Sequence, residues 1–151
     1  MTVGSAALAP LTKTVVVPCA LDRAFELFTS QINAWWPLRT HSVGEDASEQ
    51  VEMQCRVGGE IVETLADGTT AVWGTLSEWA PPHRVRFSWH PGQLPAEATQ
   101  VDVAFESDGS STRVTLVHSG WQGRLDGTTA RHGYDTGWDL VLGGYTAALA
   151  S

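Results

Sequence analysis

The chain is short of basic residues and of cysteine. Among its 151 residues only nine are lysine or arginine, against 17 aspartates and glutamates, which gives a formal net charge of −8 at pH 7. Binding to nucleic acid needs a clustered basic face that neutralises phosphates, so this balance argues against nucleic acid and acidic membranes as partners. The two cysteines, Cys19 and Cys55, provide neither a disulfide framework nor a metal-binding CxxC pair, and we expect a reducing, cytoplasmic location.

The chain also has no long apolar run and no familiar catalytic motif. No segment approaches the ~20 apolar residues of a membrane-spanning helix. Residues 1–10 are small and apolar but have no basic leader, so we expect a frayed N-terminus followed by one domain over residues 11–151. The motifs GxSxG, HExxH, GxGxxG, the P-loop and the EF-hand loop are absent, and the five histidines have no metal-ligand spacing. We therefore predict no metal and no cofactor.

What the chain does contain is a change of hydrophobic period. Residues 11–17 are rich in valine and threonine and predict a strand, which Pro18 ends. An apolar stripe of helical period predicts a helix over residues 21–28, and a second short helical piece over residues 30–36 should end before Pro37. After a polar connection the period becomes two, and strands are predicted near residues 51–56, 60–65, 70–79, 83–90, 100–106 and 112–118.

Short turns and a long last helix complete this pattern. The strands are separated by turn-forming pairs such as Asp67-Gly68 and Asp108-Gly109, and short connections of this kind join antiparallel neighbours. The helix expected over residues 128–150 contains four glycines, each costing about 1 kcal/mol relative to alanine, so it must be stabilised by docking on the sheet. We expect Gly137 to allow a close approach of helix and sheet. The order of elements predicts an α+β fold.

Several short motifs in a fixed order carry a family resemblance. They are Trp35-Trp36-Pro37, Arg56-Val57-Gly58-Gly59, Trp73-Gly74, Pro81-Pro82 with Arg84, Phe87-Ser88-Trp89, the Thr112-to-His118 strand with Gly120-Trp121, and Gly137-Trp138. In this order the chain resembles the START-like, or SRPBCC, superfamily and, within it, the group named after the activator of Hsp90 ATPase homologue 1. The resemblance implies a helix-grip fold: a curved antiparallel sheet of about seven strands wrapped around a long C-terminal helix, with two short helices after the first strand.

Two residues are candidates for chemistry at the seam between the last strand and the last helix. Strand alternation places His118 on the same face as Val114 and Leu116, where an imidazole could orient a ligand or act as a base. A core histidine hydrogen-bonded to backbone or to a hydroxyl is the alternative. Tyr134 begins the buried stripe of the helix, so its hydroxyl could reach the same space, although tyrosines at such seams also serve in packing.

The abundant aromatic residues are candidates for the wall of a cavity between sheet and helix. The expected cavity residues are Trp36, Met53, Ile61, Trp73, Phe87, Trp89, Val103, Leu116, His118, Trp121, Tyr134, Trp138 and Leu142. Large side chains on both walls favour a compact or planar ligand, and a filled core is the alternative. Trp35 and Trp36 could form a lid over the mouth or cap the edge of the sheet.

Charged residues near this expected cavity allow two further expectations. Glu60 and Glu63 lie on opposite faces of one expected strand. Glu63 could be buried if its face points inward, or could lie near solvent at the rim. Arg39 and His41, in the polar connection after Trp36, could meet an anionic group of a ligand at the entrance, or belong to a solvated loop.

Three functions are compatible with this sequence. The first is binding of a small hydrophobic or planar ligand without a cofactor. The second is an enzyme of the cyclase or hydrolase type that uses the same cavity. The third is a protein-interaction or co-chaperone role, with a protein partner or a homodimer. The resemblance does not separate them, because one fold hosts many functions.

Overall fold

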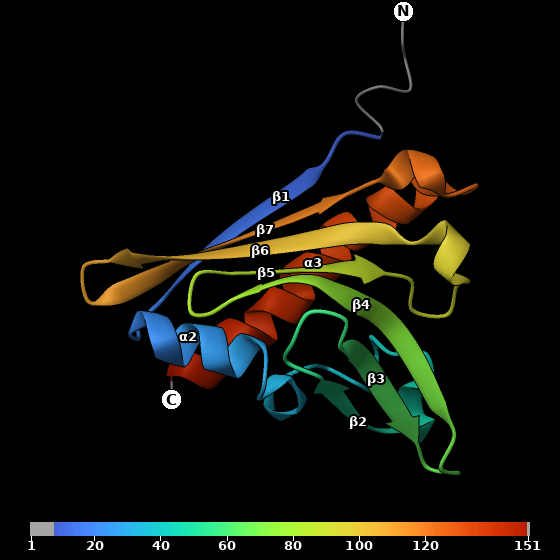
Figure 1. Ribbon diagram of the computed structural model, residues 1–151, viewed down its shortest axis with the longest axis horizontal. Helices are drawn as coiled ribbons and strands as arrows, with labels where there is room; N and C mark the ends of the chain where they lie inside the picture. The colour runs from blue at the N-terminus through green and yellow to red at the C-terminus, as the bar shows by residue number, and fades with distance from the viewer. Residues whose placement is uncertain (1–7, 151) are drawn as a thin grey trace, which may run out of the picture.

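The computed structural model describes residues 8–150, so the expected frayed N-terminus lies largely outside the described residues. Its centre is a seven-stranded antiparallel sheet with the order β1-β7-β6-β5-β4-β3-β2. The strands are β1 (Leu11–Val17), β2 (Ser48–Met53), β3 (Glu60–Leu65), β4 (Thr70–Ala80), β5 (Arg84–Trp89), β6 (Thr99–Asp108) and β7 (Ser111–Ser119). Figure 1 shows the sheet curving from the flat β1, β7 and β6 part into the strongly bent β4 and the short β3 and β2.

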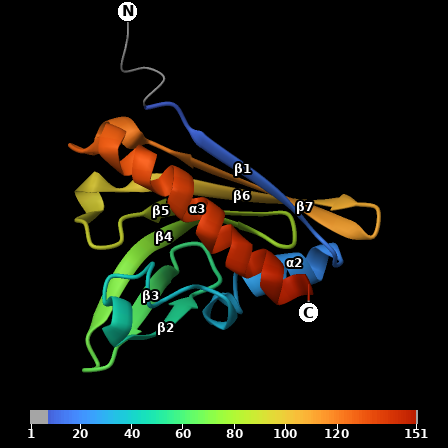
Figure 2. The same ribbon diagram turned by 180° about the vertical axis from the view of Figure 1, so that it is seen from behind.

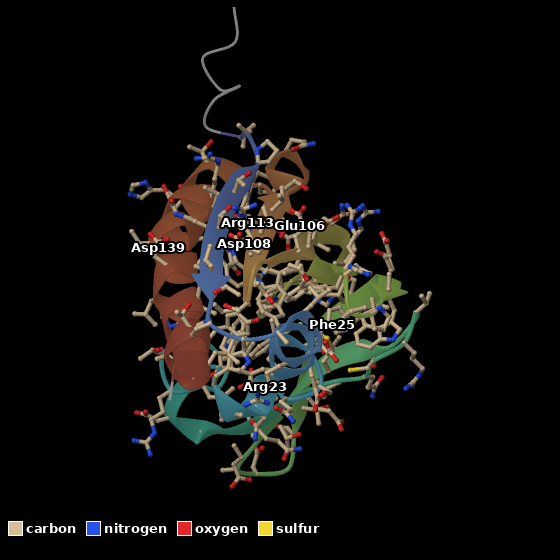
Figure 3. The ribbon with its side chains drawn as sticks, turned by 90° about the vertical axis from the view of Figure 1, so that its left-hand side faces the viewer. Arg23, Phe25, Glu106, Asp108, Arg113 and Asp139 are labelled. Carbon is tan, nitrogen blue, oxygen red and sulfur yellow. The ribbon has the colours of Figure 1, made fainter. Side chains whose placement is uncertain are left out.

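One long helix covers the concave side of this sheet. Helix α3 (Gly127–Ala150) crosses the strands diagonally in Figure 2, and the shorter helix α2 (Leu21–Phe28) lies near its C-terminal end. Lys13 of β1 forms ion pairs with Asp135 and Asp139 of α3, at 2.5 and 3.1 Å, which tie the helix to the edge of the sheet. Figure 3 shows Asp139 on the outer side of α3, whereas Phe25 of α2 points toward the interior. No helix of the described part is long and apolar enough to span a membrane.

Alternation of apolar and polar residues explains which side of the sheet is covered. In β5, Val85, Phe87 and Trp89 are buried, while Arg84 and Arg86, at alternate positions, stay partly exposed on the outer face. There both arginines hydrogen-bond to Asp102 of β6. The buried residues of β5 pair with β6, as in Val85 with Val103, so that both strands present one continuous apolar face to α3.

The helix-grip fold predicted from the sequence is confirmed, with three local differences. The second helical piece is a single 3₁₀ turn, Ile32–Ala34, so α2 and α3 are the only α-helices of the described residues. Strand β2 begins at Ser48, inside the expected polar connection. Gly137 does not bring α3 close to the sheet, because an added Cβ there would meet only the ring of His41, at 3.9 Å.

Candidate functional site

An open pocket of about 330 Å³ lies between the concave face of the sheet, the middle of α3 and the loop that follows Trp36. Its lining residues are Trp36, Thr40, His41, Ser42, Val43, Trp89, Pro91, Gly92, Tyr134, Gly137, Trp138 and Val141. The volume is about twice that of a dry 150 Å³ cavity that accepts benzene, so the space suits a flat molecule of two or three fused rings.

Three indole rings and a phenol ring form the inner wall of the pocket. Trp89 lies 5.8 Å from Trp36 and 5.6 Å from Trp138, measured between ring centroids. Trp36 and Trp138 are 6.0 Å apart and meet edge to face, while Tyr134 stacks on Trp138 at 6.1 Å. Because rings in contact hold one another rigid, this wall offers flat apolar area that loses little conformational entropy when a ligand binds.

A chain of hydrogen bonds supports the wall from behind. The indole Nε1 of Trp138 donates to Nδ1 of His118 at 2.9 Å, so Nδ1 is the unprotonated nitrogen. The protonated Nε2 then donates to Oγ1 of Thr99 at 2.6 Å, and the Thr99 hydroxyl donates to the carbonyl of Trp89 at 3.1 Å. Burial, with a smaller contribution from Arg124, lowers the pKa of His118 from 6.5 to about 3. His118 is therefore a neutral imidazole with protein partners on both nitrogens.

Tyr134 has a different environment: it lines the pocket, and its hydroxyl lies beside Trp89 and Arg124. Its oxygen accepts a hydrogen bond of 3.0 Å from Nε1 of Trp89. Burial raises the pKa of Tyr134, and the Trp89 N–H and the neighbouring Arg124 partly oppose this shift. Among the described residues, no acceptor is found for the proton of this hydroxyl. Tyr134 can therefore donate that proton to a ligand oxygen. The hydrogen bond that its oxygen accepts from Trp89 makes the hydroxyl a stronger donor.

The outer wall is an irregular loop that a buried carboxylate fixes in place. Glu63 of β3 is fully buried, and its two oxygens accept hydrogen bonds of 2.9 Å from the backbone N–H groups of Val43 and Gly44. A third bond, of 2.8 Å, comes from Nε1 of Trp73. Burial alone would raise the pKa of Glu63, but these donors outweigh it and hold the pKa below its ordinary value. The sequence allowed a rim or a buried position for Glu63, and the structure shows the buried one.

The same loop brings His41 to the pocket. Nε1 of Trp36 donates to the backbone carbonyl of His41 at 2.6 Å. The His41 ring lies against α3 where Gly137 has no side chain: an added Cβ there would be 3.9 Å from both Cδ2 and Nε2 of the imidazole. Its Nδ1 lies 2.7 Å from Oγ1 of Thr40. Of the two entrance candidates, His41 lines the pocket, whereas Arg39 does not.

The structure brings together some of the expected cavity residues and separates others. Trp36, Trp89, Tyr134 and Trp138 line the pocket, and His118 lies directly behind it. The remaining members are packed in the buried core away from the pocket: Met53, Ile61, Trp73, Phe87, Val103, Leu116, Trp121 and Leu142. Thr40, Ser42, Val43, Pro91 and Gly92 were not expected, because they lie in loops that carry no hydrophobic period.

No cluster of three or more potential metal-binding side chains occurs in residues 8–150. The pocket instead combines apolar walls with a few polar side chains, those of Tyr134, His41, Thr40 and Ser42. This arrangement can orient a planar molecule that carries oxygen atoms at its edges.

Comparison with known proteins defines the family. A family profile described as "Activator of Hsp90 ATPase homolog 1-like protein" matches residues 18–150. The chain belongs to this family. No curated protein sequence matches the chain.

The solved structures that are similar to this chain include a synthase. The chain is 34% identical to an anthrahydroquino-γ-pyrone synthase, Txn09, whose structure is complexed with a ligand named SUM; the match covers 82% of this chain and 84% of that one, with a TM-score of 0.60. An Aha1 dimer from Colwellia psychrerythraea shares the fold at 15% identity and a TM-score of 0.68. The match covers 93% of this chain and 96% of that one. DynU16, a putative protein of the dynemicin biosynthetic locus, matches at 18% identity and a TM-score of 0.67, over 94% of this chain and 47% of its own.

Proposed function

We propose that this protein binds a planar, polycyclic aromatic molecule in the pocket bounded by Trp36, Trp89, Tyr134 and Trp138. The observation that carries the proposal is the wall itself: three indole rings and a phenol ring are among the twelve residues that line about 330 Å³ of open space. A fused-ring molecule would contact several of these rings at once. The 34% identity to an anthrahydroquino-γ-pyrone synthase supports the same ligand class.

Tryptophan fluorescence offers a direct test, because three of the seven tryptophans line the pocket. Anthraquinone should quench the emission with saturation, and it should raise the melting temperature because it binds the folded state alone. A fatty acid of similar mass should do neither. Absence of quenching by anthraquinone and by related fused-ring ketones would remove the proposal.

A matched pair of variants on α3 locates the binding site. Gly137→Leu places a branched side chain at the pocket surface and should abolish quenching. Gly133→Leu adds the same side chain one turn earlier, where a Cβ meets no atom within 4 Å, and should leave quenching intact. Equal loss of binding in both variants would place the ligand elsewhere.

A cyclase-type reaction on such a molecule is the second candidate. Tyr134 favours it, because a hydroxyl whose oxygen accepts the Trp89 N–H can stabilise negative charge that develops on a ketone oxygen during ring closure. Turnover of an open-chain aromatic precursor, lost in Tyr134→Phe, would support this candidate. The co-chaperone role and the homodimer stay predictions, to be checked by ATPase assays with a chaperone and by light scattering.

A further inference from the structure

His41 is the polar group of the pocket whose role is least explained by packing. Its backbone is held by two hydrogen bonds: the amide donates to the carbonyl of Pro37 at 2.9 Å, and the carbonyl accepts from Trp36. The hydroxyl of the adjacent Ser42 donates to the carbonyl of Leu38, and the amides of Val43 and Gly44 donate to Glu63. The imidazole is thus carried on a loop whose position is fixed, as a binding group requires.

One short contact on the loop bears on the tautomer of His41. Its Nδ1 lies 2.7 Å from Oγ1 of Thr40, whose hydroxyl also has the carbonyl of Pro37 as an acceptor at 3.4 Å. In the tautomer with the proton on Nδ1, Nδ1 donates to Oγ1 of Thr40 and Nε2 presents a lone pair. That nitrogen lies on the ring edge that faces Gly137, and no protein donor is found for it among residues 8–150.

Beside the hydroxyl-bearing Thr40 and Ser42, two residues of opposite character line the pocket. Tyr134 presents an O–H donor, and His41 presents an acceptor nitrogen from the opposing loop; Gly137, one turn after Tyr134 on α3, leaves the space in front of the imidazole open. Trp89 and Trp138 line the same pocket. A ligand that satisfies both groups must carry an acceptor oxygen on one edge and an acidic O–H on another.

We propose that His41 accepts a phenolic proton of the ligand, so that the pocket selects planar aromatic ketones with a free phenol over the same ketones without one. The ketone oxygen accepts the proton of Tyr134. The phenol O–H transfers its proton to Nε2 of His41, which leaves a phenolate paired with an imidazolium, and no other bond forms or breaks. This deepens the proposed function and depends on it, because it names the functional groups that the fused-ring ligand must carry.

Three probes test the selection: anthraquinone, 2-hydroxyanthraquinone and 2-methoxyanthraquinone. The hydroxyl at the 2-position is too far from the ring ketone for an internal hydrogen bond, so it is available to the protein. We expect the hydroxy compound to bind about tenfold more tightly than the other two, as one charge-assisted hydrogen bond allows. At a pH where the free compound is neutral, its bound form should show the long-wavelength absorption band of the phenolate.

Variants of His41 separate proton transfer from packing. His41→Ala removes the acceptor, and His41→Gln places an amide oxygen nearby that accepts a hydrogen bond but takes no proton at this pH. Both should lose the phenolate band and the preference, and both should still bind anthraquinone. Arg39→Ala, on the same loop but outside the pocket, should retain the band and the preference. Thermal melting of each variant confirms that it is folded.

The outcomes distinguish this inference from the proposed function. If anthraquinone binds but the hydroxy compound binds equally tightly, or if the phenolate band persists in His41→Ala, the role of His41 is overturned while the aromatic pocket stands. If the band is lost in Arg39→Ala instead, the charge of that arginine accounts for it, and the assignment to His41 is overturned. If none of the three probes quenches the fluorescence, both proposals are overturned together.

Discussion

Trp138 donates the hydrogen bond of its indole N–H to Nδ1 of His118, at 2.9 Å, and thereby joins the wall of the pocket to the last strand of the sheet. His118 is also held at its other ring nitrogen, which is hydrogen-bonded to Thr99, and Thr99 is hydrogen-bonded to the carbonyl of Trp89. His118, a candidate base from the sequence, thus uses both ring nitrogens to hold the aromatic wall. This relationship makes His118 a positioning residue, and its neutral state a condition of the fold.

The free energy of unfolding should decrease as the pH is lowered, because His118 stays neutral in the folded protein. The pKa is about 3 in the folded protein and about 6.5 in the unfolded chain, so between these values the unfolded chain binds a proton that the folded protein does not. Stability from this group is complete above pH 6.5 and is lost as the pH falls toward 3, at up to about 1.4 kcal/mol per pH unit. Urea denaturation between pH 4 and pH 8 measures this slope.

The control for this slope is His118→Asn, which retains an oxygen acceptor for Trp138 but cannot titrate. We expect it to be less stable than the wild type at pH 7, by about 1–3 kcal/mol, and to show a shallower dependence on pH in this interval. An unchanged slope in His118→Asn would assign the pH dependence to other groups.

Glu63 should control the shape of the pocket from a distance. In Glu63→Gln the amide places an N–H group against one of three N–H donors, those of Val43, Gly44 and Trp73. We expect a loss of about 2–4 kcal/mol in the free energy of unfolding and a loss of affinity for a fused-ring ligand, because the loop with His41 is released. Chemical denaturation and fluorescence titration measure the two effects.

Glu60→Gln is the matched control, since Glu60 begins the same strand. Among residues 8–150 its carboxylate forms no hydrogen bond or ion pair, so the substitution should change stability by less than about 0.5 kcal/mol. If Glu60→Gln and Glu63→Gln behave alike, or if Glu63→Gln binds the ligand with unchanged affinity, the carboxylate does not hold the loop.

Local sequence patterns predicted most of the fold, and the errors of this prediction have a physical cause. Alternation in β5 and β6 and the glycine turns between strands act over a few residues, so the sequence predicted them well. Strand β2 was placed three residues too late, because it lies at the edge of the sheet and its first residues, Ser48 to Gln50, are polar and largely exposed. An edge strand with one solvated face gives a weak periodic signal.

The pocket was less predictable than the fold, because contacts between distant residues create it. Alternation places Glu60 and Glu63 on opposite faces of β3 but does not say which face is inward. The path of the loop from Thr40 to Gly44 depends on bonds to Glu63, 19 and 20 residues further along the chain. His41 could be named as an entrance candidate from its position after Trp36, but its contact with Gly137 depends on tertiary structure.

The glycines of α3 should differ in their response to alanine. A Cβ at Gly133 or at Gly143 meets no atom within 4 Å, so each replacement should raise the free energy of unfolding by about 0.5–1 kcal/mol through helix propensity alone. At Gly144 the added Cβ would lie 3.2 Å from the carbonyl oxygen of Trp35, and the gain should vanish or reverse. Thermal denaturation of the three variants checks this order; a gain at Gly144 equal to that at Gly133 would contradict it.

The two tyrosines of the chain provide a final comparison, because the same substitution should have different consequences. Tyr145 is fully buried and donates its hydroxyl to the carbonyl of Ala24 at 2.7 Å, so Tyr145→Phe removes a structural hydrogen bond and should cost about 1–2 kcal/mol.

Tyr134→Phe leaves the buried indole N–H of Trp89 without its acceptor and removes the donor that faces the pocket. It should cost a similar amount of stability and also weaken the binding of anthraquinone by about tenfold, whereas Tyr145→Phe should bind it as the wild type does. Fluorescence titration beside urea denaturation separates the two effects. If both variants lose stability and neither loses affinity, the hydroxyl of Tyr134 acts in packing alone and the ketone of the ligand is oriented by another group.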